Sequence, residues 1–268
     1  MEHITSRQNA RIKQVAKLRQ RRGRENQNRI IIDGFREIQR AIESGVRLLE
    51  IYFTETPETM AKTTSWADEQ NLSDVQFIST TSSVFEKISY GNRSSGAVAV
   101  AAPPNLSLQN LPTEGKSLFV VIEGVEKPGN IGAILRSADG AGVKGVIICD
   151  GGTDIFNPNT IRASLGTIFT TKISAATRNS AIDWLQKTKT NVYVARVDGS
   201  EVYCSEDYSA RTAFVLGSEA DGVSAAWKTP EFKGIHLPMC GRADSLNVSA
   251  SAAVLFYEAN RQRATKIL

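Results

Sequence analysis

The chain has 268 residues, of which 41% are hydrophobic and 22% charged, and its formal net charge is +4. This composition favours a packed globular protein of one large or two modest domains over a disordered chain. No apolar run approaches the roughly 18 residues that span a bilayer, and the polar, basic start lacks a signal core, so we expect a cytoplasmic protein without a membrane segment.

Cysteine and histidine are too scarce for several kinds of site. The cysteines Cys149, Cys204 and Cys240 are widely separated and odd in number, which argues against a disulfide framework and against a zinc site. The two histidines are His3 and His236, and His236 stands in a short strand pattern that favours a structural role. We therefore expect chemistry that uses no metal, no histidine base and no Ser/His/Asp triad.

Positive charge is concentrated at the start of the chain. Residues 1–30 hold nine Lys/Arg and two Glu, a net charge of +7, which leaves −3 for the rest of a chain whose total is +4. Such a block is typical of a protein that binds a polyanion, although a solvated helix face would have the same composition. The candidate phosphate-binding residues of this block are Arg7, Arg11, Lys13, Lys17, Arg21 and Arg22.

Thr5 and Gln8 form a candidate capping box, after which Ile12, Val15 and Leu18 recur at helical spacing. Strands are predicted at 30–32, 48–53, 75–78 and 97–102, with helices at 35–42, 60–69 and 83–88 between them. Residues 1–102 are therefore predicted to form a small α/β domain. Residues 103–116 are polar, contain three prolines and show no periodicity, which indicates a linker.

A second alternating run fills residues 117–268. Strands are predicted at 118–122, 145–149, 171–173, 192–195, 213–217 and 235–237, and helices at 130–141, 159–165, 180–187 and 245–262. Near-continuous apolar strands that alternate with helices indicate a parallel sheet covered on both faces. Ligands of such sheets bind outside the carboxyl ends of the strands.

Three of these strand ends carry unusual loops, at residues 123–136, 214–223 and 237–251. Each also has an ordinary interpretation, with glycines for tight turns, Asn130 and Ser245 as helix N-caps, and Arg136 as a surface charge. A cradle for nucleotide phosphates is disfavoured, because the loops contain neither GxGxxG nor a Walker GK[ST] sequence.

Taken together, three motifs in these loops carry a family resemblance: Asn130-Ile-Gly-Ala-Ile-Leu-Arg136, Leu216-Gly-Ser-Glu219-Ala-Asp-Gly222, and Leu237-Pro-Met239 leading to Ser245-Leu-Asn247-Val-Ser249. They resemble the motifs of the SpoU (TrmH-type) RNA ribose methyltransferases of the SPOUT superfamily. Residues 156–166 resemble the family's stretch between the first two motifs. Residues 5–53 resemble its appended substrate-binding domain, which is similar to an RNA-binding ribosomal-protein fold. Lys127 is a departure, since an acidic residue is common there.

The resemblance implies an α/β fold in two parts. The C-terminal parallel sheet would contain a deep trefoil knot, with residues 213–250 threaded through a loop, and a smaller N-terminal α/β domain of ribosomal-protein type would bind RNA. It also implies a homodimer through the catalytic domain, with the last helix as an interface element.

The cofactor that the resemblance implies is S-adenosyl-L-methionine. Backbone groups near Gly217, Leu237 and Leu246 would hold its adenine, while Leu246 and Met239 would provide apolar walls. The reaction implied is methyl transfer to a ribose 2'-hydroxyl of RNA, with ribosomal RNA favoured.

The resemblance also assigns roles to residues in the motifs, and it implies Asn130, Arg136, Glu219, Ser245 and Asn247 as catalytic residues. Arg136 would activate the 2'-hydroxyl, either electrostatically or as a base whose proton the RNA phosphate draws off; because arginine is normally protonated, we favour the electrostatic role. Glu219 would hold an Arg or Asn side chain, and Ser245 and Asn247 would contact substrate or cofactor. Arg162 is a further candidate for RNA phosphate contact.

Other functions stay open at this point. The chain could be a transfer RNA ribose or base methyltransferase, or a non-catalytic RNA-binding or ribosome-assembly factor that keeps the fold. The presence of Asn130, Arg136 and Glu219 argues against the non-catalytic alternative. A nicotinamide dehydrogenase is disfavoured because the glycine fingerprint is missing.

Overall fold

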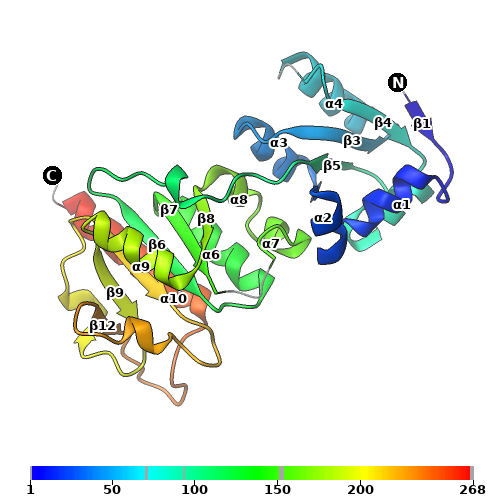
Figure 1. Cartoon of the computed structure of the whole chain (residues 1–268). Coiled ribbons are helices and arrows are strands. Elements are labelled where there is room, and N and C mark those ends of the chain that lie inside the picture. Colours follow the sequence, from blue (N-terminus) through cyan, green and yellow to red (C-terminus); the bar gives the residue numbers. More distant parts are fainter. Residues whose placement is uncertain (1, 70–71, 93, 151–153, 266–268) are drawn as a thin grey trace. The chain divides into compact units, whose positions relative to one another are not determined.

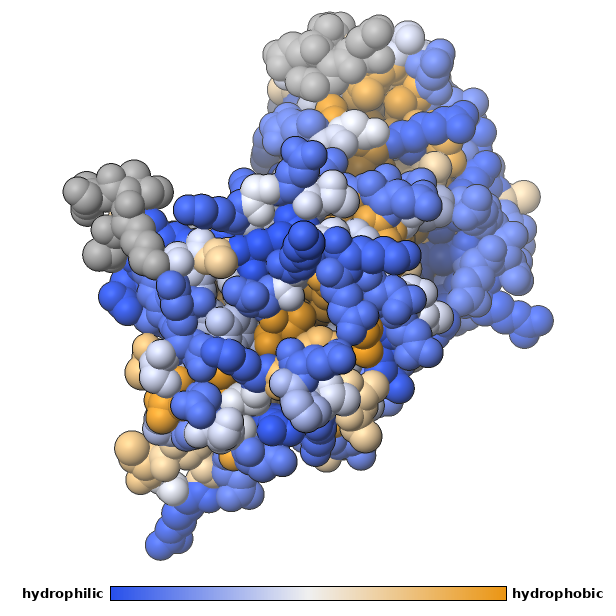
Figure 2. Space-filling model, turned by 60° about the vertical axis from the view of Figure 1, so that its left-hand side comes forward, coloured by the Kyte–Doolittle hydropathy of each residue, from blue (hydrophilic) through white to orange (hydrophobic). Residues whose placement is uncertain are grey.

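The computed structural model describes residues 2–69, 72–92, 94–150 and 154–265. The chain divides into two compact units, one of Met1–Pro104 with Phe156–Thr170 and one of Asn105–Ile155 with Thr171–Leu268 (Figure 1). On the face drawn in Figure 2, hydrophilic residues cover most of the surface and hydrophobic ones show only in limited patches. Within the described ranges, no helix combines the length and the apolar character needed to cross a membrane.

The first unit is built on a five-stranded sheet with the order β1-β4-β3-β5-β2. Its strands are β1 (Glu2–Ile4), β2 (Ile30–Asp33), β3 (Leu48–Thr54), β4 (Gln76–Thr80) and β5 (Ala97–Ala101). Strands β1, β4 and β3 are parallel, whereas β5 runs antiparallel to β3 and β2. Its helices are α1 (Ala10–Lys17), α2 (Arg21–Gln27), α3 (Phe35–Glu43), α4 (Pro57–Glu69), α5 (Ser82–Ile88), α7 (Pro158–Ala163) and α8 (Thr167–Thr170). The predicted N-terminal α/β domain is confirmed.

The start of this unit differs from the predicted helix start. Residues 2–4 form an edge strand, because burying Ile4 against the core draws this segment into the sheet. Helix α1 therefore begins only at Ala10, and its cap is the side chain of Asn9, which accepts from the Arg11 amide at 2.8 Å. The predicted capping box at Thr5 is wrong. The basic segment also forms two helices instead of one.

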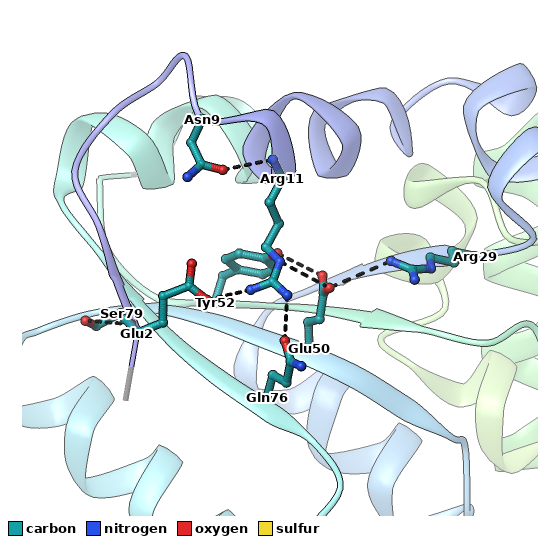
Figure 3. A network of polar contacts seen from close by, with 8 residues as sticks. All are labelled: Glu2, Asn9, Arg11, Arg29, Glu50, Tyr52, Gln76 and Ser79. Carbon is teal, nitrogen blue, oxygen red and sulfur yellow. Dashed lines mark hydrogen bonds and ion pairs between the residues drawn. The ribbon is translucent and has the colours of Figure 1, made fainter.

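Polar contacts tie the basic segment to the sheet (Figure 3). Arg11 donates to Glu2 at 2.6 Å and lies 3.6 Å from the carboxylate of Glu50. Arg29 approaches the same carboxylate at 3.7 Å, and the hydroxyl of Tyr52 donates to it at 2.8 Å. Burial, together with this carboxylate, raises the pKa of Tyr52, so the phenol keeps its proton. Arg11 and Arg29, two cations of the basic block, therefore contact Glu50 of the sheet and contribute to the stability of the first unit.

The second unit contains a seven-stranded sheet with the order β10-β12-β9-β11-β6-β7-β8, in which every paired strand is parallel. The strands are β6 (Leu118–Glu123), β7 (Gly145–Cys149), β8 (Ile173–Ala176), β9 (Asn191–Ala195), β10 (Glu201–Val202), β11 (Thr212–Leu216) and β12 (Lys233–His236). This confirms the predicted parallel sheet. The predicted strand at 171–173 begins two residues later than expected.

Helices cover both faces of this sheet, as Figure 1 shows. Helix α9 (Arg178–Lys187) packs Ala181 and Leu185 onto one face, against alternating side chains of the central strands. Helices α6 (Pro128–Gly140) and α10 (Val248–Thr265) pack against each other on the opposite face. Residues 105–111 also join this unit, since the Leu106 carbonyl accepts from the Ala175 amide at 2.9 Å and Leu111 lies in the core.

Candidate functional site

Four adjacent strands bring the conspicuous loops to one edge of the second sheet. The order β12-β9-β11-β6 is continuous, and because these strands are parallel, the loops after all four leave from the same edge. A pocket of about 630 Å³ opens there, lined by the ends of β9, β11 and β12 and the residues that follow them. This volume lies within the range of about 300–1,000 Å³ that is typical of small-molecule sites.

The loop after β11 is folded back tightly on itself. The amides and carbonyls of Ser218 and Gly222 exchange two hydrogen bonds, at 3.1 and 3.0 Å. A β-carbon added to Gly217 would lie 2.1 Å from the carbonyl carbon of Gly222, which is far inside contact distance. Only glycine therefore fits at residue 217 while the loop keeps this closed form.

Three residues predicted from the motifs meet beside this loop. The Asn130 side chain donates to the Glu219 carboxylate and accepts from Asn247 at 3.4 Å. Helix α6 begins at Pro128, so Asn130 lies in its first turn and does not act as its N-cap. Likewise α10 begins at Val248, so Ser245 precedes that helix and is not its N-cap. Ser245 lines the pocket together with Glu219 and Asn247. Both side chains are therefore available for other contacts.

Arg136 is the one predicted catalytic residue outside this group. It is exposed on α6, six residues after Asn130, and it is not part of the pocket wall. Within the described part of the chain, its guanidinium makes no hydrogen bond or ion pair, so the cation is free to meet an anionic group from outside.

All four predicted cofactor residues line the pocket, namely Gly217, Leu237, Met239 and Leu246. The loop after β9 and the end of β12 complete the wall, with Arg196, Val197, Asp198 and His236. Sequence reasoning missed these residues, although the rule used for the other loops also applies to the carboxyl end of β9.

Glu123 is a further residue that the motifs did not single out. Its buried carboxylate accepts from the amide and hydroxyl of Ser224, at 2.7 and 2.9 Å, and from Arg178 at 2.5 Å. Burial alone would raise the pKa of this carboxyl, but the hydrogen bonds outweigh it and hold the pKa below its ordinary value. Because Ser224 follows the loop after β11, Glu123 fixes the exit of that loop.

Part of the basic block lines a hollow in the first unit. Lys13 and Lys17 lie one turn apart on α1 and, with Lys87 of α5, border a groove of about 410 Å³. None of the residues that line this groove is acidic, which suits a phosphate group.

The other predicted RNA-binding cations are placed differently. Arg7 and Arg22 are exposed, and Arg21 forms an ion pair with Glu25 at 2.7 Å. Arg162 is exposed on α7, with its guanidinium 4.5 Å from the centre of the Tyr90 ring. Arg11 belongs to the network around Glu50 (Figure 3).

The pocket suits a nucleoside-like molecule better than a metal ion. Within the described ranges, no group of three or more His, Cys, Asp or Glu side chains is placed to hold a metal. The exposed apolar side chains of Leu246 and Val197 border the pocket, and the tight turn at Gly217 forms part of its lining. Apolar walls with a few polar groups are what an adenosine-bearing cofactor requires.

Comparison with known proteins agrees with this geometry. The model of the SpoU rRNA Methylase family matches residues 117–257, and that of the MRM3-like substrate binding domain matches residues 9–99. A 23S rRNA (uridine(2479)-2'-O)-methyltransferase of Streptomyces viridochromogenes is 29% identical, over 97% of this chain and 92% of its own length. The 23S rRNA (guanosine(2553)-2'-O)-methyltransferase RlmP of Bacillus subtilis is 28% identical, over 96% and 98%.

Solved structures are similar along the whole chain. The crystal structure of an RNA 2'-O ribose methyltransferase superposes with a TM-score of 0.82 at 35% identity, covering 98% of this chain and 99% of that one. The SpoU methyltransferase AviRb of S. viridochromogenes, solved in complex with AdoMet, gives a TM-score of 0.87 at 26% identity and covers 96% and 99%.

Proposed function

The chain belongs to the SpoU rRNA methylase family, and on that premise we propose that it transfers a methyl group from S-adenosylmethionine to a ribose 2'-hydroxyl of ribosomal RNA. The observation that carries this is the meeting of the three motif loops, since Asn130 of the first contacts Glu219 of the second and Asn247 of the third, and these last two residues line the pocket. Two relatives that match nearly the whole chain are named 23S rRNA 2'-O-methyltransferases, which favours ribosomal RNA over transfer RNA.

The reaction sets two requirements for the protein. S-adenosylmethionine supplies an electrophilic methyl group, so the protein must position the 2'-hydroxyl and stabilise negative charge as its proton leaves. Arg136 provides a free cation for this second task, because no carboxylate among the described residues forms an ion pair with it. Glu219 orients the amide of Asn130, and Asn247 links that amide to the start of α10.

The cofactor residues act mainly through shape. Gly217 lets the loop after β11 close on itself, and this closed loop forms part of the pocket lining. Leu237, Met239 and Leu246 give apolar surface for the adenine ring, and Ser245 offers a hydroxyl beside Glu219 and Asn247.

RNA binding would fall mainly to the first unit. Lys13, Lys17 and Lys87 line a groove whose described lining holds no acidic residue, and a phosphate of the RNA backbone would suit it. Arg7, Arg22 and Arg162 are exposed and would extend the basic surface. Residues 1–102 would thus form the substrate-binding domain, 103–116 the connection and 117–268 the catalytic domain, except that residues 156–170 fold with the first unit and residues 105–111 with the second.

Three further features belong to the same proposal. The path from β11 to β12 crosses beyond β9 before α10 returns to pack on α6, and this path supports a trefoil knot in residues 213–250. Tyr257 on α10 is 54% exposed, and apolar surface of this kind suits the interface of a homodimer formed by the catalytic domain. A ribosomal RNA substrate supports a cytoplasmic location for the reaction.

The proposal is tested by incubating the purified protein with ribosomal RNA and S-adenosylmethionine that carries a tritiated methyl group. After digestion to nucleosides, we expect the label on a 2'-O-methyl group. Arg136→Ala should abolish transfer while calorimetry still detects the cofactor, and Lys144→Ala, at the amino end of β7, should behave like the wild type. Label on a base would refute ribose methylation, and cofactor binding without any transfer would favour a non-catalytic RNA-binding factor.

A further inference from the structure

The basic groove of the first unit ends beside an aromatic side chain that the proposed function does not use. Helix α1 packs against α5, and Lys13 and Lys17 of α1 line the groove together with Lys87 of α5. The side chains of Lys13 and Lys17 are exposed and form no hydrogen bond or ion pair within the described part of the chain. Helix α5 ends at Ile88, and Tyr90 follows two residues later. A tyrosine thus stands three residues after a lysine of the groove.

Arg19 ties this tyrosine to the end of the groove. Two residues after Lys17, its Nε and Nη2 donate to the carbonyl of Ile88 at 3.1 and 2.6 Å. Its guanidinium lies 5.8 Å from the centre of the Tyr90 ring. The amide of Tyr90 donates to the carboxylate of Asp33, which Arg19 also approaches at 3.5 Å. These contacts hold Tyr90 beside the carboxyl end of α1, where the groove ends.

A second guanidinium lies closer to the same ring. Arg162, on α7, is 4.5 Å from the centre of the Tyr90 ring, as expected of a cation that an aromatic ring attracts. Its side chain forms no hydrogen bond or ion pair among the described residues, so its N–H donors are unused. Tyr90 is half-exposed and Arg162 is exposed, so both reach the surface of the first unit.

A basic groove beside an aromatic ring is the arrangement that binds unpaired RNA. Such proteins hold the backbone in a positively charged groove and stack bases on aromatic rings or on the planes of arginine side chains. An RNA duplex is recognised mostly through its shape, phosphates and 2'-hydroxyls, because its base faces are covered by neighbouring base pairs. A duplex would therefore contact the lysines but leave the Tyr90 ring unused.

We propose that the first unit binds an unpaired segment of the RNA substrate, with its phosphates in the groove and one base stacked against Tyr90 and Arg162. This inference rests on the proposed function and narrows its substrate to RNA that offers a single-stranded segment. It assigns a base contact to Tyr90 and gives Arg162 a planar role in addition to its charge.

The test is fluorescence anisotropy of the full chain with three labelled probes of equal length. They are a single-stranded RNA that cannot pair with itself, its duplex with the complementary strand, and an abasic ribose-phosphate strand. The abasic strand has the same phosphates without the bases. We expect the single strand to bind at least about fivefold more tightly than the abasic strand, which is the smallest effect typical of one stacked base, and more tightly than the duplex.

Substitutions assign this preference to the aromatic site. Tyr90→Leu should weaken binding of the single strand at least about fivefold and remove its advantage over the abasic strand. The slope of log affinity against log salt should stay unchanged, because no phosphate contact is lost. Tyr90→Phe keeps the ring and should bind like the wild type, whereas Arg162→Lys keeps the charge without the plane and should lose part of the advantage. Tyr203→Leu, at a half-exposed tyrosine of the second unit, is the control.

Unchanged affinity in Tyr90→Leu would overturn the inference, and so would a wild-type chain that binds the abasic strand or the duplex as tightly as the single strand. Melting curves show whether each variant folds, and the three probes decide the inference with the wild type alone if Tyr90→Leu does not. A chain that prefers the single strand as expected but transfers no methyl group to ribosomal RNA would instead refute the proposed function. The two failures are therefore distinguishable.

Discussion

The closed loop after β11 makes a sharp prediction for Gly217→Ala. The new β-carbon would lie 2.1 Å from the backbone of Gly222, and reaching an ordinary contact of 3.4 Å requires a shift of about 1.3 Å. That shift breaks the two hydrogen bonds between Ser218 and Gly222, at a net cost of about 0.5–1.5 kcal/mol each, or about 1–3 kcal/mol together. If the cofactor binds only the closed loop, its Kd rises roughly 5- to 150-fold.

Calorimetry with S-adenosylmethionine measures this change directly, with a thermal melt to show that the sheet remains folded. Gly241→Ala is the matched control, because a β-carbon there meets nothing within 4 Å in the neighbouring loop. We expect the control to bind like the wild type. Wild-type affinity in Gly217→Ala would show that cofactor binding does not need the closed form of the loop.

The contacts of Glu123, of Lys13 and Lys17, and of Asn130 can also be tested by substitution. Because the fold lowers the pKa of Glu123, its carboxylate stabilises the folded chain at pH values above its ordinary pKa of 4.5. This stabilisation is lost as the pH falls through the lowered pKa. Glu123→Gln should therefore lower the melting temperature at pH 7, by a margin that shrinks below pH 4.5. Lys13→Gln with Lys17→Gln should reduce the slope of log affinity for RNA against log salt by roughly 0.7–0.9 per lost phosphate contact, as filter binding would show. Asn130→Asp places a second carboxylate against that of Glu219, so the single-turnover rate of methyl transfer should fall at least about tenfold. Adding Glu219→Gln to this variant should restore part of the rate. Equal rates in the single and double variants would contradict the contact between the two side chains.

Much of the catalytic sheet could be predicted because its strands are apolar runs separated by helical periodicity. Such local patterns place strands within a residue or two, and parallel strand ends then bring the motif loops together. The start of the chain was harder to predict, because the strand at residues 2–4 forms only by pairing with β4, more than seventy residues away. Local pattern favoured the capping box at Thr5 over that long-range pairing.

The same reason explains which site residues were missed. The role of Glu123 depends on Ser224, which is 101 residues away, and a carboxylate at a strand end has no local signature for such a partner. The strand pattern around His236 suggested a structural role, since the sequence does not show that its ring lines the pocket. The motif residues were identified through family resemblance, and so was the expected knot, because topology of that kind has no periodic signal.

If the motif loops hold a methyl donor beside an RNA sugar, cellular RNA must carry a 2'-O-methyl group that depends on this chain, and mapping of modified nucleosides detects it. Ribosomal RNA from cells with and without the gene would be digested and compared by mass spectrometry. We expect one 2'-O-methylated nucleotide to disappear without the gene, to return with the wild-type gene, and to stay absent with Arg136→Ala. An unchanged pattern of ribose methylation, or the loss of a base methyl group instead, would show that the chain does not methylate a ribose of ribosomal RNA.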